Sequence, residues 1–187
     1  MHWMQELLQP FSKTINTLAL DLDTILGNGR RSLSQTDRRS LVRALFALIE
    51  ADVFNRKRIA LRLCDEGFVS FSIAELALLR EEQYVLDDKG LAKTNQKFLR
   101  LSDNLKFAIH SFVKAADIKH NIPTGTREWK AFQRSIKIRN RITHPKDPND
   151  LDINEEEFQQ IKATFNWFVA NKEELLKKLI ARHGDAA

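Results

Sequence analysis

A short segment of the sequence combines three side chains suited to phosphodiester chemistry: Arg139, Asn140 and His144, with Pro145 directly after them. A histidine can move protons near neutral pH. An arginine offers a forked, permanently charged partner for phosphate oxygens, and an asparagine can orient either the phosphate or the histidine. These residue types indicate a site that binds a phosphodiester and transfers protons beside it.

The spacing of these residues sets a condition on such a site. On a helix, Asn140 and His144 are four residues apart and share a face. Arg139 and His144 are five apart, roughly 140° around an ideal helix, so they converge only if the last turn unwinds. Pro145 supplies a reason for unwinding. The alternative is that the segment is only a helix end, because a helix C-terminus favours cations and a histidine before proline can act as a cap.

A charged stripe in an earlier predicted helix bears on the same site. Arg43, Glu50 and Lys57 are seven residues apart and stack along one helix face that apolar residues flank. A charge on a largely apolar face normally needs a partner. One interpretation is that Glu50 pairs with Arg139 and fixes its guanidinium fork. The other is that Glu50 pairs locally with Arg43 or Lys57, or faces solvent.

Basic residues surround the segment, and an acidic run follows it. Lys137, Arg141 and Lys146 could extend an RNA-binding surface through phosphate contacts, or they could be solvated charges at a helix end. The acidic run of residues 147–157 argues against a broadly RNA-attracting surface, and could restrict access or bind a basic partner. The chain has 30 Lys and Arg against 25 Asp and Glu, a net charge of +5, which permits a nucleic-acid partner without requiring one.

Other catalytic and metal-binding patterns are missing from the sequence. It contains no Gly-rich phosphate loop, no Gly-x-Ser-x-Gly segment and no His-Glu-x-x-His pair. The other histidines have no metal-ligand spacing, so we expect neither a metal nor another cofactor; they are His2, His110, His120 and His183. The one cysteine, Cys64, lies in an apolar helical pattern and is predicted to be a core residue.

Apolar residues recur at helical spacing through nearly the whole chain. We expect helices over residues 5–26, 35–64, 72–82, 95–118, 126–144 and 154–182. Capping residues mark three of the helix starts: Ser72 with Glu75, Thr126, and Asn154 with Glu157. Residues 84–91 are predicted to form a small hairpin or a loop. The predicted fold class is an all-α bundle of about five to six helices.

Length and composition fit one ordinary domain. The chain has 187 residues, of which 43% are hydrophobic and 29% charged, and no repeat or long linker divides it. We therefore expect a single domain over residues 1–187, with an N-terminal helical extension at 1–30 and a core bundle at 35–182. No apolar run approaches the ~18 residues of a membrane span, and no secretory signal is visible. Together with the single cysteine, these features predict a cytoplasmic protein.

The segment from Arg139 to Pro145 resembles the signature of the HEPN superfamily. In that signature an arginine and a histidine are separated by four to six residues, the first of them polar and often asparagine. Here Asn140 follows Arg139 directly, and a proline after His144 is also common in that family. The helix layout is similar over about residues 34–182, with the motif at the end of a late helix and one more helix behind it, and residues 1–30 carry no such resemblance.

The resemblance implies a helical bundle that forms a homodimer, in which two copies of the motif face each other across a cleft. Many members are metal-independent endoribonucleases of toxin–antitoxin, phage-defence and RNA-processing systems. By the resemblance, Arg139 would stabilise the scissile phosphate, Asn140 would position groups in the site, and His144 would act as general acid and base while the RNA 2′-hydroxyl attacks. Some members also have an acidic residue on an early helix near the motif arginine, which is the place of Glu50 here.

Three functions follow as alternatives. The first is a homodimeric HEPN-type endoribonuclease, a toxin or antiviral defence effector that an antitoxin or other protein could regulate. The second is a non-catalytic HEPN-like module that uses the same cleft to bind RNA, a nucleotide or a partner protein. The third is an unrelated helical bundle, in which Arg139 and His144 point to separate surfaces. The sequence favours the first.

Overall fold

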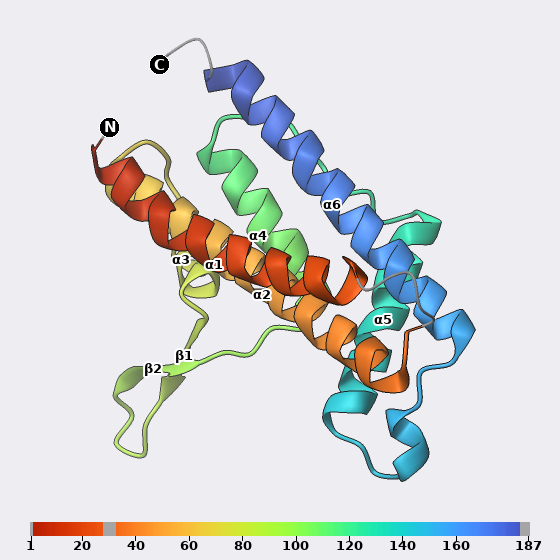
Figure 1. The fold of residues 1–187 in the computed structure, drawn as a ribbon. Coiled ribbons are helices and arrows are strands. Elements are labelled where there is room, and N and C mark those ends of the chain that lie inside the picture. Colours follow the sequence, from red (N-terminus) through yellow and green to blue (C-terminus); the bar gives the residue numbers. More distant parts are fainter. Residues whose placement is uncertain (1, 28–32, 184–187) are drawn as a thin grey trace. The chain divides into compact units, whose positions relative to one another are not determined.

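A computed structural model describes residues 2–27 and 33–183 of the chain. The elements follow in the order α1 (His2–Gly27), α2 (Gln35–Asp65), α3 (Ile73–Leu79), β1 (Glu82–Leu86), β2 (Ala92–Gln96), α4 (Leu101–Ala115), α5 (Arg127–Thr143), the 3-10 helix η1 (Pro148–Leu151) and α6 (Glu155–His183) (Figure 1). The predicted all-α bundle with a small insertion is confirmed, and the insertion is a two-stranded antiparallel hairpin.

The chain folds into two compact units. The first unit comprises Met1–Asp52 and Ile122–Lys177, and the second comprises Val53–Asn121 and Lys178–Ala187. The segment from Arg139 to His144 belongs to the first unit, as does Glu50, and the hairpin belongs to the second. The long helices α2 and α6 contribute residues to both units.

Aromatic side chains from three helices form much of the core of the first unit. Phe46 of α2 stacks on Phe132 of α5, with the ring centroids 6.4 Å apart. Trp167 of α6 lies 5.4 Å from Phe132 and 5.7 Å from Trp129 between ring centroids. All four side chains are buried, and burial of such large apolar surfaces is the dominant favourable term in folding. This packing fixes which face of α5 is buried and which face meets solvent.

The predicted capping residues begin their helices as expected. At α3, the Ser72 hydroxyl accepts from the Glu75 N–H at 3.2 Å, and the Glu75 carboxylate accepts from the Ser72 N–H at 2.7 Å. At α5, the Thr126 hydroxyl accepts from the Trp129 N–H at 3.2 Å. The same reciprocal arrangement joins Asn154 and Glu157 at the start of α6. Each contact satisfies a backbone N–H that has no partner within the helix, so the helix starts are locally encoded.

The predicted end of the third helix is wrong by three residues. α3 ends at Leu79 rather than at Glu82. Glu81 adopts a left-handed backbone conformation with φ of 58°, and Glu82 already pairs with Gln96 in the hairpin. The helix therefore ends just before strand pairing begins. The local pattern of residues does not predict this boundary.

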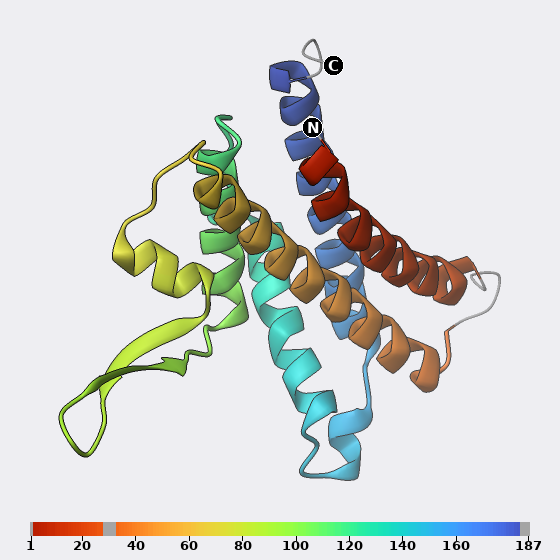
Figure 2. The ribbon, with the colours of Figure 1, turned by 90° about the vertical axis from the view of Figure 1, so that its left-hand side faces the viewer.

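The predicted start of the fourth helix is also wrong. α4 begins at Leu101, not at Asn95, because Asn95 and Gln96 belong to β2. The turn of the hairpin is built around Asp87, whose carboxylate accepts from the Lys89 and Leu91 N–H groups at 2.9 Å each. Figures 1 and 2 show the hairpin projecting away from α3 and α4, the neighbouring helices of its unit.

An ion pair of the buried Lys57 joins the residue before β1 to the helices of the second unit. The Lys57 ammonium on α2 donates to Glu81 at 2.9 Å and to Asn104 of α4 at 3.1 Å. Lys57 is only 2% exposed, so these two acceptors replace the water that its charge has lost.

The predicted N-terminal extension at 1–30 lies partly outside the described residues, since residues 1 and 28–30 are not among them. Among the helices of residues 2–27 and 33–183, none combines the length and the apolar character that crossing a membrane would require.

Candidate functional site

Arg139 is held between two acceptors near the C-terminal end of α5. Its Nη2 donates to Glu50 Oε1 of α2 at 2.5 Å, and its Nη1 donates to Asn140 Oδ1 at 3.1 Å. The contact between Glu50 and Arg139 that the charged stripe suggested is therefore present. Both side chains are partly exposed, so the remaining N–H groups of the guanidinium can reach a ligand from solvent.

The other members of the stripe do not pair with Glu50. Lys57 is bound to Glu81 and Asn104, and Arg43 is exposed. The local pairing that was the alternative for Glu50 is thus not seen. Glu50 itself is a surface residue rather than a buried charge, so the ion pair costs little desolvation and acts chiefly to orient the Arg139 fork.

His144 is the C-cap of α5. Its backbone N–H still donates to the Asn140 carbonyl at 3.0 Å, and its φ and ψ of −128° and 61° end the helix. The imidazole is exposed, and within the described ranges it has no hydrogen-bond partner. Because no hydrogen bond from the described residues restrains the ring, it is accessible to a substrate or to a second protein chain.

The last turn of α5 does not unwind. The Thr143 hydroxyl donates to the Arg139 carbonyl at 2.7 Å, and the helix continues to Thr143. Pro145 disfavours helical geometry at the residue before it, and the helix ends at Thr143 with His144 as its C-cap. Arg139 and His144 therefore keep positions roughly 140° apart around one α5. Helix spacing alone therefore does not bring the two side chains together.

The three predicted phosphate-binding residues have different environments. The Arg141 Nη2 donates to both carboxylate oxygens of Glu157 at 2.8 Å each, so this guanidinium is engaged in holding α5 to the start of α6. Lys137 and Lys146 are exposed. Of the three, these two lysines are available to a phosphate.

The acidic run after the motif is largely used within its own loop. The Asp150 carboxylate accepts from the Lys146 N–H at 2.8 Å and from the Asp147 N–H at 3.2 Å. The Lys146 N–H is the leading cause of the lowered pKa of Asp150. Asp147 in turn caps η1 by accepting from the Asn149 N–H at 2.8 Å. These carboxylates shape the loop rather than form a free acidic surface.

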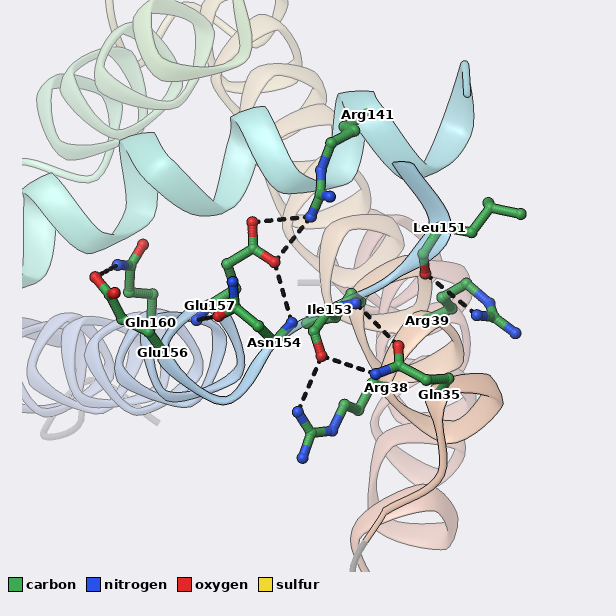
Figure 3. A network of polar contacts seen from close by, with 10 residues as sticks. All are labelled: Gln35, Arg38, Arg39, Arg141, Leu151, Ile153, Asn154, Glu156, Glu157 and Gln160. Carbon is green, nitrogen blue, oxygen red and sulfur yellow. Dashed lines mark hydrogen bonds and ion pairs between the residues drawn. The ribbon is translucent and has the colours of Figure 1, made fainter. Parts of the chain in front are cut away.

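Residues at the start of α2 anchor the same loop (Figure 3). The Gln35 side-chain amide donates to the Ile153 carbonyl at 3.0 Å and accepts from the Ile153 N–H at 2.9 Å. Arg38 donates to the same carbonyl at 3.0 Å, and Arg39 donates to the Leu151 carbonyl at 3.2 Å. The residue pattern does not predict these contacts, because main-chain acceptors leave no signal in it.

The described residues contain no group of three or more His, Cys, Asp or Glu side chains placed to hold a metal ion. Comparison of the chain with protein-family models, with curated proteins and with solved structures gave no match. A helix C-terminus carries a partial negative charge, so binding of a phosphate here depends on the cationic side chains around it.

Proposed function

We propose that the chain is a metal-independent endoribonuclease of the HEPN type. The observation that carries the proposal is the row Glu50–Arg139–Asn140, which presents an oriented guanidinium at the end of the helix that also bears the exposed His144. Arginine in this state suits the charge of a scissile phosphate, and histidine suits proton transfer. Asn140 and Glu50 are positioning residues, since each acts on Arg139.

The proposed reaction needs no group beyond these side chains and the RNA. A His144 imidazole accepts the proton of a ribose 2′-hydroxyl as its oxygen attacks the adjacent phosphorus. The bond from phosphorus to the 5′-oxygen breaks, and an imidazolium protonates that leaving oxygen. Arg139 balances the charge that grows on the phosphate oxygens. The products are a 2′,3′-cyclic phosphate and a 5′-hydroxyl, and DNA, which lacks the 2′-hydroxyl, is not a substrate.

A homodimer would supply the convergence of Arg139 and His144 that helix spacing alone does not provide. If two copies of the motif face each other, Arg139 of one protomer and His144 of the other can address the same phosphate. A two-fold interface places the same surface of both protomers in contact, so both composite sites form together. A toxin or defence role, with an antitoxin or other regulator covering the site, belongs to the same proposal through the family resemblance.

The test is RNA cleavage in excess EDTA by wild type, His144→Ala and Arg139→Lys from matched purifications. The expected result is cleavage by wild type that leaves cyclic-phosphate ends, with both variants reduced by roughly a hundredfold or more. His110→Ala is the control, because His110 is an exposed histidine on α4 and lies far from the motif in the sequence. This variant should cleave RNA as well as wild type does. Equal cleavage by His144→Ala and wild type would refute the assignment.

A second candidate is a non-catalytic module that binds RNA, a nucleotide or a partner protein. The unrestrained His144 ring favours it, since a general base is usually oriented by a third group. Tight RNA binding without strand scission on long incubation, unchanged in His144→Ala, would select this candidate over the ribonuclease.

A further inference from the structure

The entire net charge of the chain resides in one helix. α5 carries six basic residues and one acidic residue, Glu128, a net charge of +5. The whole chain, with 30 basic and 25 acidic residues, also has a net charge of +5. Outside α5, basic and acidic residues are therefore equal in number. Such a concentration of basic residues in one helix favours a positive potential beside it.

Four of these basic residues form a stripe along the exposed side of α5. They are Arg127, Lys130, Arg134 and Lys137, spaced three or four residues apart, and all four are exposed. This spacing aligns side chains on one helix face. Lys130 and Lys137 are seven residues apart, and the next position along the same line is His144. The stripe thus leads along the helix to the motif histidine, over roughly 25 Å from Arg127 to His144.

The stripe differs from the other arginines of α5 in having no ion-pair partner. Arg139 is bound to Glu50 and Arg141 to Glu157. Across residues 33–183, by contrast, no side chain forms an ion pair or hydrogen bond with any of the four stripe residues. Like charges three or four residues apart on a helix destabilise it. Arg127 has a favourable electrostatic interaction with the neighbouring Glu128. The remaining cations of the stripe, Lys130, Arg134 and Lys137, form a row that points to an anion outside the chain.

We propose that the stripe binds the sugar-phosphate backbone of a single-stranded RNA segment that continues from the scissile phosphate along α5. The identity of the polyanion rests on the proposed ribonuclease function. A regular row of cations matches the repeated charge of a nucleic-acid strand. Attack by a 2′-hydroxyl requires a backbone that can rotate until the leaving oxygen stands opposite, and a single strand rotates more readily than a duplex.

The experiment measures binding without cleavage. A fluorescently labelled, mixed-sequence single-stranded RNA is titrated with His144→Ala protein over a series of salt concentrations. The stripe variant adds Lys130→Gln, Arg134→Gln and Lys137→Gln. We expect roughly tenfold or greater weakening of binding. We also expect the slope of log affinity against log salt to fall by about 2, since each phosphate contact on a single strand contributes ~0.7.

Two matched variants control for charge and for folding. Lys89→Gln, Lys93→Gln and Lys119→Gln, also on His144→Ala, remove the same charge from exposed lysines outside α5 and should leave the slope unchanged. Lys130→Arg with Lys137→Arg keeps the charge and should bind like the parent. Unchanged affinity and slope in the stripe variant would overturn the proposal, as would an equal loss in the charge control. A duplex of the same sequence that competes as well as the single strand would overturn the single-strand assignment.

The result of this binding experiment is independent of the ribonuclease test. Binding is measured on a variant that is not required to cleave, so a failure of cleavage in wild type leaves the stripe result standing. Conversely, wild-type cleavage with no role for the stripe would refute only the stripe.

Discussion

Ser135 and Thr164 share a hydrogen bond of 2.9 Å between their hydroxyl groups, one on α5 and the other on α6. Both side chains are fully buried. Each hydroxyl therefore depends on the other for the hydrogen bond that water would otherwise supply. This pair is a local test of how closely α5 is packed in the first unit.

We predict that Thr164→Val and Ser135→Ala each lower the free energy of unfolding by about 1 to 2 kcal/mol, because each leaves one buried hydroxyl without a partner. The double variant should cost about as much as one single variant, since it removes both groups. Urea denaturation of wild type, the two single variants and the double variant measures the coupling free energy between the two hydroxyls. Additive losses would show that the two hydroxyls are not coupled.

Single residues also show how far the sequence predicts the site. Glu50 was recognised because a charge on an apolar stripe needs a partner, and Arg139 is that partner. The same reasoning could not find the partners of Lys57, since Glu81 and Asn104 lie in elements whose placement depends on strand pairing. The motif residues themselves were visible because their spacing is local.

At the scale of elements, the hairpin is the least locally encoded part of the fold. A two-stranded hairpin is at best marginally stable in isolation, and every residue of β2 is exposed. Its attachment to the helices includes Glu81, which binds the buried Lys57. Burial acts to raise the pKa of Glu81, but the hydrogen bond and charge of Lys57, together with Asn104, outweigh it and lower that pKa.

The sign of the resulting pH dependence follows from this lowered pKa. A carboxyl whose pKa is lower in the folded state stabilises the fold above its unfolded pKa, near 4.3 for glutamate. That contribution is lost as the pH falls through the folded value. We predict that Glu81→Gln lowers the free energy of unfolding at pH 7 by about 1 kcal/mol, a value reduced by the partial exposure of Glu81.

Urea denaturation at pH 7 and at about pH 3 checks this prediction. The difference between wild type and Glu81→Gln should shrink at the lower pH, because the contribution of the Glu81 charge is lost as the pH falls toward the lowered pKa of the folded carboxyl. Glu82→Gln, the neighbouring residue on β1, is the matched control and should show little difference at either pH. If the difference in the free energy of unfolding between wild type and Glu81→Gln stays constant with pH, the role assigned to the Glu81 charge is wrong.

The helix boundaries show why some elements were predicted and others were not. Starts with a cap, as at Ser72 and Thr126, depend on contacts within three residues. The start of α4 depends instead on Asn95 and Gln96 of β2, which pair with Gln83 and Glu82 of β1. Strand pairing across a turn has weaker local signals than a helix cap, so residues 95–100 read as the beginning of a helix.

At the scale of the whole molecule, the proposed site is a property of two chains. Arg139→Ala and His144→Ala are each expected to be inactive alone. If Arg139 of one protomer works with His144 of the other, mixing the two inactive proteins creates heterodimers with one intact composite site. Half of the dimers in an equal mixture are heterodimers, so about a quarter of wild-type activity should return.

The measurement is RNA cleavage in EDTA after the two variants are mixed. One control is each variant alone, and the other is a mixture at a protein concentration too low for dimers to form. Recovery that depends on protein concentration supports the shared site. No recovery from a mixture that sedimentation shows to be dimeric would place Arg139 and His144 of the same chain in one site, or place neither in it.

The anchoring of the loop behind His144 has a consequence for how this protein can vary. Three side chains at the start of α2 form hydrogen bonds with backbone groups of Leu151 and Ile153: Gln35, Arg38 and Arg39. Every residue type offers a backbone carbonyl. The anchor thus makes little demand on side-chain identity along much of the loop. Loop positions other than Asp147, Asp150 and the buried Ile153 are therefore open to replacement while the backbone path is kept. Substrate preference could be re-engineered there without redesigning the bundle.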